Sequence, residues 1–104
     1  MLEIIWKRGA EDDLLRIFAE LEEFGEGTGA RFVEVLDGTL QYLRRYPRMA
    51  PVFEHPMRRL VAGNSGFGVF YTVEGRGIIV HALIHLSQSP EAIRSRLLQM
   101  LGPK

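Results

Sequence analysis

Two apolar runs between Phe67 and Pro90 constrain the fold of this chain more than any other stretch. The runs FGVFYTV and IIVHALIHLSQSP are rich in β-branched and aromatic residues and are separated by the glycine-containing stretch EGRG. This pattern predicts an antiparallel β-hairpin with a four-residue loop. Regular alternation places Ile78, Val80, Ala82 and Ile84 on one face of the second run, opposite Ile79 and Leu83. Because both faces are apolar, we expect a central strand covered by other elements.

The size and composition of the chain fit one domain over residues 1–104. No apolar run approaches the ~20 residues that a membrane span needs, so we expect no membrane partner. The N-terminal residues show no secretory pattern, and the sequence contains no cysteine. Together these features predict a cytoplasmic protein without disulfide bonds or thiolate chemistry.

Charge is divided unevenly along a chain whose formal net charge is zero. Residues 1–37 carry ten acidic and four basic side chains, and residues 38–104 carry three acidic and nine basic ones. Proteins that bind nucleic acids generally have a clear positive excess, because their affinity comes from replacing condensed counterions. We therefore expect no direct binding to nucleic acid, although the basic half suits an acidic protein partner.

The first half of the chain predicts a short strand at Leu2–Trp6 followed by two helices. Apolar residues at helical spacing begin after Ala10, with Glu11, Asp12 and Asp13 in the first turn, where the helix dipole favours acidic side chains. The stretch GEGTG ends this helix, and a second runs from Thr28 to just before Pro47. Two amphipathic helices with a short connection form an antiparallel helical hairpin.

The second half predicts strands and one more helix. Val52–Ala62 is expected to be an edge or bulged strand, because Pro56 interrupts it. Ser89 is a good N-cap for a final helix that starts at Pro90 and ends at Gly102–Pro103. The order is β-α-α-β-β-β-α, which predicts an α+β fold with a helical hairpin packed on a mostly antiparallel four-stranded sheet.

The histidines predict neither a metal site nor a cofactor site. On a regular strand His81 and His85 share a face and are separated by roughly 13 Å, too far to hold one metal ion. We expect His81 at the edge of the core, hydrogen-bonded to the main chain, and His85 at a strand end. The chain also lacks the common phosphate-binding and catalytic motifs. Tyr71 alternates with Phe67, Val69 and Val73, which indicates packing rather than proton donation.

The candidate binding residues are basic and apolar side chains of the second half. Arg44, Arg45 and Arg48 complement the dipole at a helix C-terminus, which explains them without a partner. Arg58 and Arg59 are adjacent on a strand and point to opposite faces, so only one of them is free to face an acidic partner. Residues chosen as the partner-binding set are Arg48, Arg58, Arg59, Arg94, Arg96, Leu98 and Met100, the last two because the terminal helix has more apolar residues than one face buries.

The whole chain resembles the RelE/ParE toxin superfamily of bacterial type II toxin–antitoxin systems. The resemblance is carried by AEDDLLRIFAEL, YLRRYP, RRLVAGNSGFGVFYTV and IIVHALIHLSQSP in this order. It implies a cytoplasmic toxin in a hetero-oligomer with a cognate antitoxin, expected to be of the ribbon-helix-helix, ParD-like type. RelE-like members cleave mRNA on the ribosome, and ParE-like members poison DNA gyrase.

The nuclease pattern of the superfamily is not matched here. Its two arginine positions fall on Gly68 and Gln88, and its C-terminal tyrosine position falls near Arg94. RNA cleavage needs cationic groups and proton transfer that glycine and glutamine do not supply. The expectation is therefore a ParE-like protein-binding toxin that acts on gyrase and has no catalytic residue. The alternatives are a RelE-type endonuclease that uses Arg58, Arg59, Tyr71 and Arg94, and an inactive homologue that binds only the antitoxin.

Overall fold

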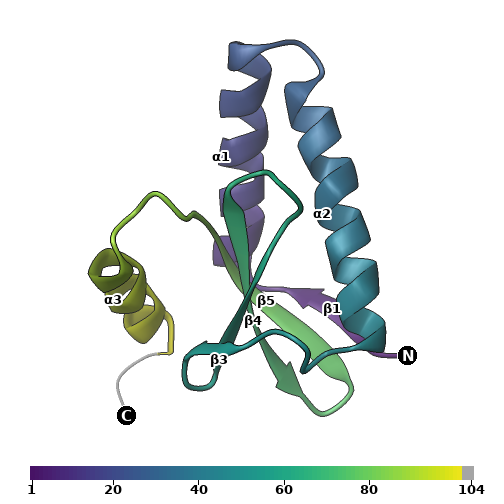
Figure 1. The fold of residues 1–104 in the computed structure, drawn as a ribbon, viewed down its shortest axis with the longest axis vertical. Coiled ribbons are helices and arrows are strands. Elements are labelled where there is room, and N and C mark those ends of the chain that lie inside the picture. The colour runs from purple at the N-terminus through teal and green to yellow at the C-terminus, as the bar shows by residue number, and fades with distance from the viewer. Residues whose placement is uncertain (102–104) are drawn as a thin grey trace.

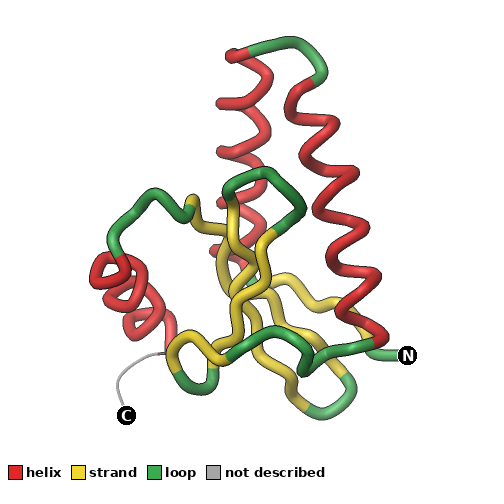
Figure 2. Tube along the Cα trace, in the orientation of Figure 1, coloured by secondary structure: helices red, strands yellow, loops and turns green. Residues whose placement is uncertain are grey.

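The computed structural model describes residues 1–101 and shows an α+β fold. Figure 1 shows its helices and strands, and Figure 2 shows the loops that connect them. The elements are β1 (Glu3–Trp6), α1 (Arg8–Phe24), α2 (Thr28–Arg45), β2 (Val52–Glu54), β3 (Met57–Val61), β4 (Phe67–Glu74), β5 (Gly77–His85) and α3 (Pro90–Leu101). This confirms the predicted class and helices, while the predicted helix end at Gly102–Pro103 lies outside the described residues.

The sheet has five strands in the order β1-β5-β4-β3-β2, one more than predicted. The additional strand arises because Val52–Ala62 is not one interrupted strand. It folds back at His55–Pro56, so that β2 pairs antiparallel with β3. Proline has no main-chain N–H for a ladder, which suits the turn between them. β1 pairs with β5 in parallel, and the other pairs are antiparallel.

The central hairpin has a shorter loop than expected. Glu74 pairs with Gly77, which leaves two residues, Gly75 and Arg76, in the turn. Gly75 has a φ of +57° and Arg76 does not have a positive φ, which is the pattern of a two-residue hairpin loop of type II′ with glycine at its first position. The strands therefore extend into the predicted EGRG loop at both ends.

A β-bulge at His81 changes the faces of β5. Tyr71 pairs with Val80 and Phe70 pairs with Ala82, so His81 is the extra residue. Ile78, Val80 and Leu83 accordingly lie in the core under α1 and α2, whereas Ala82 and Ile84 lie in a second core on the other face. The prediction that Val80 and Ala82 share a face is therefore wrong, because it assumed regular alternation.

Helices cover both faces of the sheet. The helical hairpin packs on the face that presents Val69 and Tyr71, and α3 buries Ile93 and Leu97 on the face that presents Phe70. The molecule thus has three layers rather than the two that the element order suggests. Ser89 caps α3 as predicted, because its Oγ accepts a hydrogen bond from Ala92 N–H at 3.1 Å.

The turn between α1 and α2 is organised by one carboxylate. Glu22 accepts hydrogen bonds from the N–H groups of Gly27, Gly29 and Ala30, at 3.1, 2.8 and 3.2 Å. These amides open α2 and have no partner within the helix. Glu22 therefore supplies the N-terminal cap that Gly27, at the N-cap position, cannot provide.

No helix within residues 1–101 is both long enough and apolar enough to cross a membrane.

Candidate partner-binding surfaces

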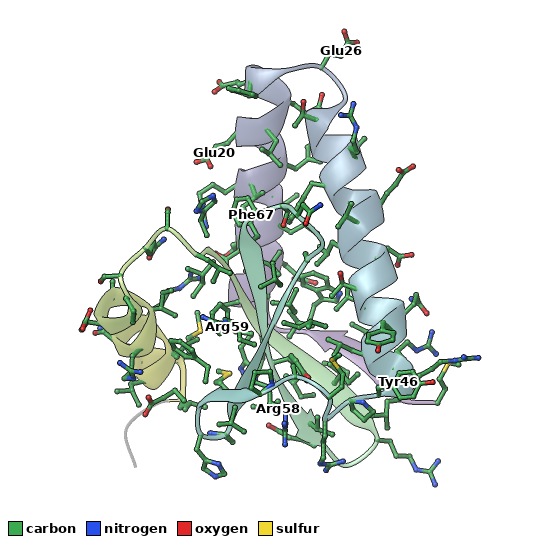
Figure 3. The ribbon with its side chains drawn as sticks, viewed as in Figure 1. Glu20, Glu26, Tyr46, Arg58, Arg59 and Phe67 are labelled. Carbon is green, nitrogen blue, oxygen red and sulfur yellow. The ribbon has the colours of Figure 1, made fainter. Side chains whose placement is uncertain are left out.

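Charge is separated in space as well as in sequence. Figure 3 shows Glu20 and Glu26 on the helical hairpin and Arg58 near the opposite end of the molecule. At that end a cavity of about 630 Å³ is lined by residues that include Arg44, Arg45 and Arg48. Arg44 is held in place there, because its Nε donates to the Leu2 carbonyl at 2.8 Å. Four arginines of the basic half of the sequence, Arg44, Arg45, Arg48 and Arg58, thus lie toward one end of the molecule.

Arg58 is engaged in the fold. Its Nη1 donates to the carbonyl oxygens of Arg48 and Ala50, at 3.2 and 2.6 Å, and so fixes the loop that follows α2. Arg48 itself is exposed. Arg58 and Arg59 point to opposite faces, as expected for neighbours on a strand. This arrangement makes Arg59 the freer of the two.

Arg59 and Arg94 meet over one aromatic ring. Their guanidinium carbons lie 5.1 and 5.4 Å from the centroid of the Phe53 ring, within the range of cation–π contacts. Arg94 also forms an ion pair with Glu54, with Nε and Oε1 2.6 Å apart. Arg59 has no carboxylate partner among residues 1–101. The cluster of Phe53, Glu54, Arg59 and Arg94, here called the Phe53 cluster, therefore retains one uncompensated positive charge.

Arg96 has an internal partner instead of a free surface position. Its Nη2 lies 2.8 Å from each oxygen of Asp13, whose side chain is only 6% exposed. Asp13 also accepts a hydrogen bond from Leu83 N–H at 2.9 Å and one from Arg16 at 3.0 Å. The expectation that Asp12 and Asp13 lie in the first turn is wrong, because α1 begins earlier, at Arg8, and only Glu11 of the three lies there. Asp13 instead connects α1, β5 and α3.

The two apolar candidates on α3 differ. Leu98 is 51% exposed, whereas Met100 is half-buried against the core on that face of the sheet. Of the chosen set, the structure thus brings Arg59 and Arg94 together. It separates them from Arg48, and it occupies Arg58 and Arg96 with internal contacts.

An apolar cavity provides a second candidate surface that sequence reasoning did not single out. It measures about 480 Å³ and lies between the helical hairpin and the turn that joins β3 to β4. Phe32 of α2 and Phe67 of β4 form its floor, with ring centroids 5.2 Å apart. Leu21 and Val35 also line it, and Val35 is 37% exposed. The hollow suits an apolar side chain of another molecule.

Tyr71 lies in the core, as predicted. It is fully buried, and its hydroxyl donates to the Pro47 carbonyl at 2.7 Å. Burial raises the pKa of this phenol, against the opposing charge of Arg58. Arg48 and Arg58 do line a cavity of about 310 Å³ nearby, but Tyr71 is not among its lining residues. The phenol therefore has no access to a substrate there.

The histidines lie on opposite faces of the sheet, not on one face as predicted, because the bulge separates them. His81 is buried with its Nε2 2.9 Å from Thr72 Oγ1, a side-chain partner rather than the expected main-chain one. His85 is exposed at the strand end, and its ring packs edge-on against Phe67. Within residues 1–101 no group of three or more histidine and carboxylate side chains is arranged to hold a metal ion.

Sequence reasoning missed Phe53 and Glu54 because their role depends on partners far along the chain. Phe53 meets Arg94 only after α3 has folded onto the sheet, and Glu54 pairs with a residue 40 positions away. The one signal for Glu54 in the sequence is its isolation, since it is the only carboxylate in a segment rich in arginine, with which carboxylates form strong ion pairs.

Comparisons with known proteins agree with this fold. A chain described as the chromosomal ParDE TA system from P. aeruginosa superposes with a TM-score of 0.71 and 20% identity, over 83% of this chain and 97% of that one. A mutant toxin from Helicobacter pylori, solved with copper bound, gives a TM-score of 0.60 and 18% identity, over 84% and 97%. None of the curated proteins matches the sequence significantly.

A family model gives the more specific result. The model described as the ParE toxin of the type II toxin–antitoxin system, parDE, matches residues 4–90, which include β1 through the start of α3. This chain therefore belongs to the ParE toxin family.

Proposed function

We propose that this chain is a toxin that its antitoxin neutralises by direct binding and that acts on DNA gyrase when free. The family match over residues 4–90 carries the proposal. Membership in the ParE toxin family supports a type II toxin. Neutralisation by an antitoxin and action on DNA gyrase are the parts of the proposal that go beyond this membership. Both activities are acts of protein binding, for which the surfaces described above are suited.

The apolar cavity is the proposed anchor point for the antitoxin. An amphipathic segment of the antitoxin places an apolar side chain in the cavity, against the rings of Phe32 and Phe67, and so desolvates a hollow otherwise open to water. Val35, which lines the cavity and is exposed, widens the apolar area that such a segment covers. An antitoxin of the ribbon-helix-helix type, with an acidic and amphipathic C-terminal segment, has the required chemistry.

The Phe53 cluster is the proposed site for acidic side chains of the antitoxin. The guanidinium of Arg59 has no carboxylate partner within the described residues. Arg94 can exchange its ion pair with Glu54 for one with a carboxylate of the antitoxin. Arg48, Leu98 and Met100 stay in the proposed partner-binding set as peripheral contacts. Arg58 and Arg96 are proposed to act through the loop and helix that they hold in place.

A strand of the antitoxin can also add to the edge of the sheet, where Val52–Ala62, expected as one edge strand, forms β2 and β3 instead. β2 already pairs with Met57 and Arg58, and Arg59 N–H donates to the Pro51 carbonyl at 3.2 Å. Main-chain groups alternate in direction along a strand, so those of Val61 point away from β4 beyond the end of β2. An added antitoxin strand therefore has two places to pair on this side of the sheet: β3 near Val61, beyond the end of β2, and the outer side of β2, which is the edge strand.

Packing around Gly68 argues against the RelE-type alternative. A Cβ atom at Gly68 would lie 3.0 Å from Leu86 Cδ2 and 3.1 Å from Phe70 Cε1. An arginine, the residue of the nuclease pattern, therefore requires the side chains of Leu86 and Phe70 to shift before it fits at this position. Gln88 lies in the turn after β5, and Tyr71 is buried beneath the loop at Pro47. This arrangement favours a binding function over RNA cleavage.

The deciding experiment is a gyrase supercoiling assay with the purified chain, alone and preincubated with the antitoxin encoded beside it. We expect the free chain to inhibit supercoiling and the complex not to. Unaffected supercoiling together with mRNA cleaved on ribosomes would establish the nuclease alternative. Unimpaired growth on expression without the antitoxin would instead identify an inactive homologue.

A further inference from the structure

A separate cavity opens at the N-terminal end of α1. It measures about 270 Å³ and is lined by Lys7, Arg8, Gly9, His81 and Met100. Neither Lys7 nor Arg8 forms an ion pair with a carboxylate of residues 1–101. The cavity therefore has two basic side chains in its wall that no internal charge neutralises. It lies apart from the apolar cavity and the Phe53 cluster, with which it shares no lining residue.

Main-chain donors add to this positive potential. α1 begins at Arg8, and its N-cap residue Lys7 makes no side-chain capping hydrogen bond. The first turn closes when Glu11 N–H donates to the Lys7 carbonyl, so the earlier amides, among them that of Gly9, precede the helical ladder. Free amides and the dipole of this 17-residue helix both favour an anion at the same end.

His81 supplies an independent indication of a ligand. It is 92% buried, since its exposed fraction is 8%, yet it lines the cavity. Thr72 Oγ1 lies 2.9 Å from both Glu74 Oε2 and His81 Nε2. Because a carboxylate only accepts, the Thr72 hydroxyl donates to Glu74 and accepts from His81 Nε2–H. This fixes the tautomer and leaves Nδ1 as an acceptor with no partner among the described residues.

We propose that this cavity binds a small tetrahedral oxyanion between the side chains of Lys7 and Arg8 and the first-turn amides of α1. On binding, His81 Nδ1 takes up a proton from solvent and donates it in a hydrogen bond to the anion. Inorganic phosphate and the phosphoryl group of a mononucleotide share this chemistry. Both fit beside Met100, which forms an apolar wall.

The electrostatic surroundings of His81 give the proposal a pH dependence. Burial lowers the pKa of His81 first, and the charge of Lys7 lowers it further, while Glu74 acts in the opposite direction. A bound anion offsets the effect of Lys7 and so raises this pKa. Anion binding therefore takes up a proton, and the affinity must increase as the pH falls. Sulfate does not titrate between pH 5 and 8, which makes it the suitable probe.

The test is an NMR titration of the full ¹⁵N-labelled chain with sulfate, phosphate, adenosine monophosphate and acetate at constant ionic strength. We expect saturable shifts of the Arg8 and Gly9 amides and of the His81 ring nitrogens, with sulfate binding more tightly at pH 5.5 than at pH 7.5. The Lys7→Gln, Arg8→Gln double variant changes only exposed side chains and should lose about tenfold or more in affinity. Arg31→Gln removes an exposed arginine of α2 as the control and should leave the affinity unchanged.

The titration distinguishes the two sources of the anion, free phosphate and a nucleotide. Tighter binding of phosphate identifies the free ion, and tighter binding of adenosine monophosphate identifies a nucleotide, and both results support the site. Absence of saturable shifts, equal affinity of the double variant, or binding of acetate as tight as that of phosphate would each overturn the proposal.

Discussion

Arg96 Nη2 lies 2.8 Å from both carboxylate oxygens of Asp13, so a residue of α3 and a residue of α1 are joined across the end of β5. The contact links helices that lie on opposite faces of the sheet. Asp13 oxygen Oδ2 also accepts from the Leu83 main chain, beyond the last β1–β5 pair at Trp6 and Val80. Asp13 thus supplies the hydrogen-bond acceptor for β5 at the point where β1 no longer pairs with it.

Replacing Asp13 with alanine should lower the free energy of unfolding by about 2–4 kcal/mol. The variant leaves the Leu83 amide without its acceptor and removes the partner of a guanidinium that is only 33% exposed. Urea denaturation of the purified chain measures the change. The control is Asp12→Ala, an exposed neighbour on the same helix for which we expect less than about 0.5 kcal/mol. Equal stability of the two variants would show that the contact contributes little.

Glycine positions in α2 give a pair of opposite predictions. A Cβ at Gly29 would come within 2.9 Å of both the ring and the carbonyl oxygen of Phe18, so Gly29→Ala should destabilise the chain by about 1–3 kcal/mol. At Gly38, in the same helix, a Cβ meets nothing within 4 Å. Gly38→Ala should therefore stabilise the chain by about 0.5–1 kcal/mol through helix propensity. Thermal or urea denaturation distinguishes the two, and a shift of the same sign in both variants would contradict the packing of α1 on α2.

The turn between the helices should lose stability in acid. Hydrogen bonds from the main chain, that of Gly27 foremost, hold the pKa of Glu22 below its ordinary value of 4.5, despite an opposing effect of desolvation. A carboxyl group whose pKa is lower in the folded state stabilises the fold above its unfolded pKa, and this contribution disappears as the pH falls through the folded value. Urea denaturation between pH 7 and pH 3 should therefore show an acid-dependent loss that is smaller in Glu22→Gln.

The matched control for this carboxylate is Glu23→Gln, which changes the adjacent exposed residue. Glu23→Gln should retain the acid-dependent loss seen in the unmodified chain. An identical pH profile for Glu22→Gln and the unmodified chain would mean that the cap contributes nothing measurable.

Tyr71→Phe should separate a packing role from a catalytic one. The change removes the hydrogen bond to the Pro47 carbonyl and should cost about 1 kcal/mol of stability. Growth inhibition on expression without the antitoxin should be unchanged, because the hydroxyl is buried beneath the loop at Pro47. If toxicity disappears while the chain remains folded, Tyr71 takes part in the activity and the nuclease alternative becomes the better one.

Arg59 should matter more for antitoxin binding than for stability. Arg59→Gln removes the unpaired guanidinium of the Phe53 cluster and should weaken antitoxin binding by about three- to tenfold, mainly through faster dissociation. Arg58→Gln is the comparison, because it removes hydrogen bonds to two carbonyl groups and should lower stability instead. Surface plasmon resonance and urea denaturation measure the two effects. Unchanged dissociation in Arg59→Gln would place the acidic contacts of the antitoxin elsewhere.

Local patterns predicted much of this fold. The apolar spacing and the breaks at Gly25 and Pro47 located both long helices, and Ser89 located the start of α3. These signals depend on neighbours within a few residues, which is why they can be read in one sequence. The partner-binding surfaces were harder to predict from the sequence. Nothing near Phe53 in the sequence indicates that Arg59 and Arg94 meet over its ring.

Polar residues with long-range roles account for most of the remaining errors. Asp13 has the position of a residue that only complements a helix dipole, yet it accepts a hydrogen bond from a residue 70 positions away. Glu22 appears as one of several acids on a solvated helix, although it caps the next helix. The residue types around His81 do not predict the bulge. Every other residue from Ile78 to Ile84 is apolar, so the pattern looks the same with or without an extra residue.

That extra residue in β5 has a consequence for how the family is compared. A relative without the bulge is one position shorter in this strand, so an alignment without a gap at His81 matches Ala82–His85 with residues of the opposite face. At 20% identity the error would be hard to notice, because apolar side chains occupy both faces. Substitution patterns for the layer under α3 and for the layer under the helical hairpin would then be exchanged over half a strand.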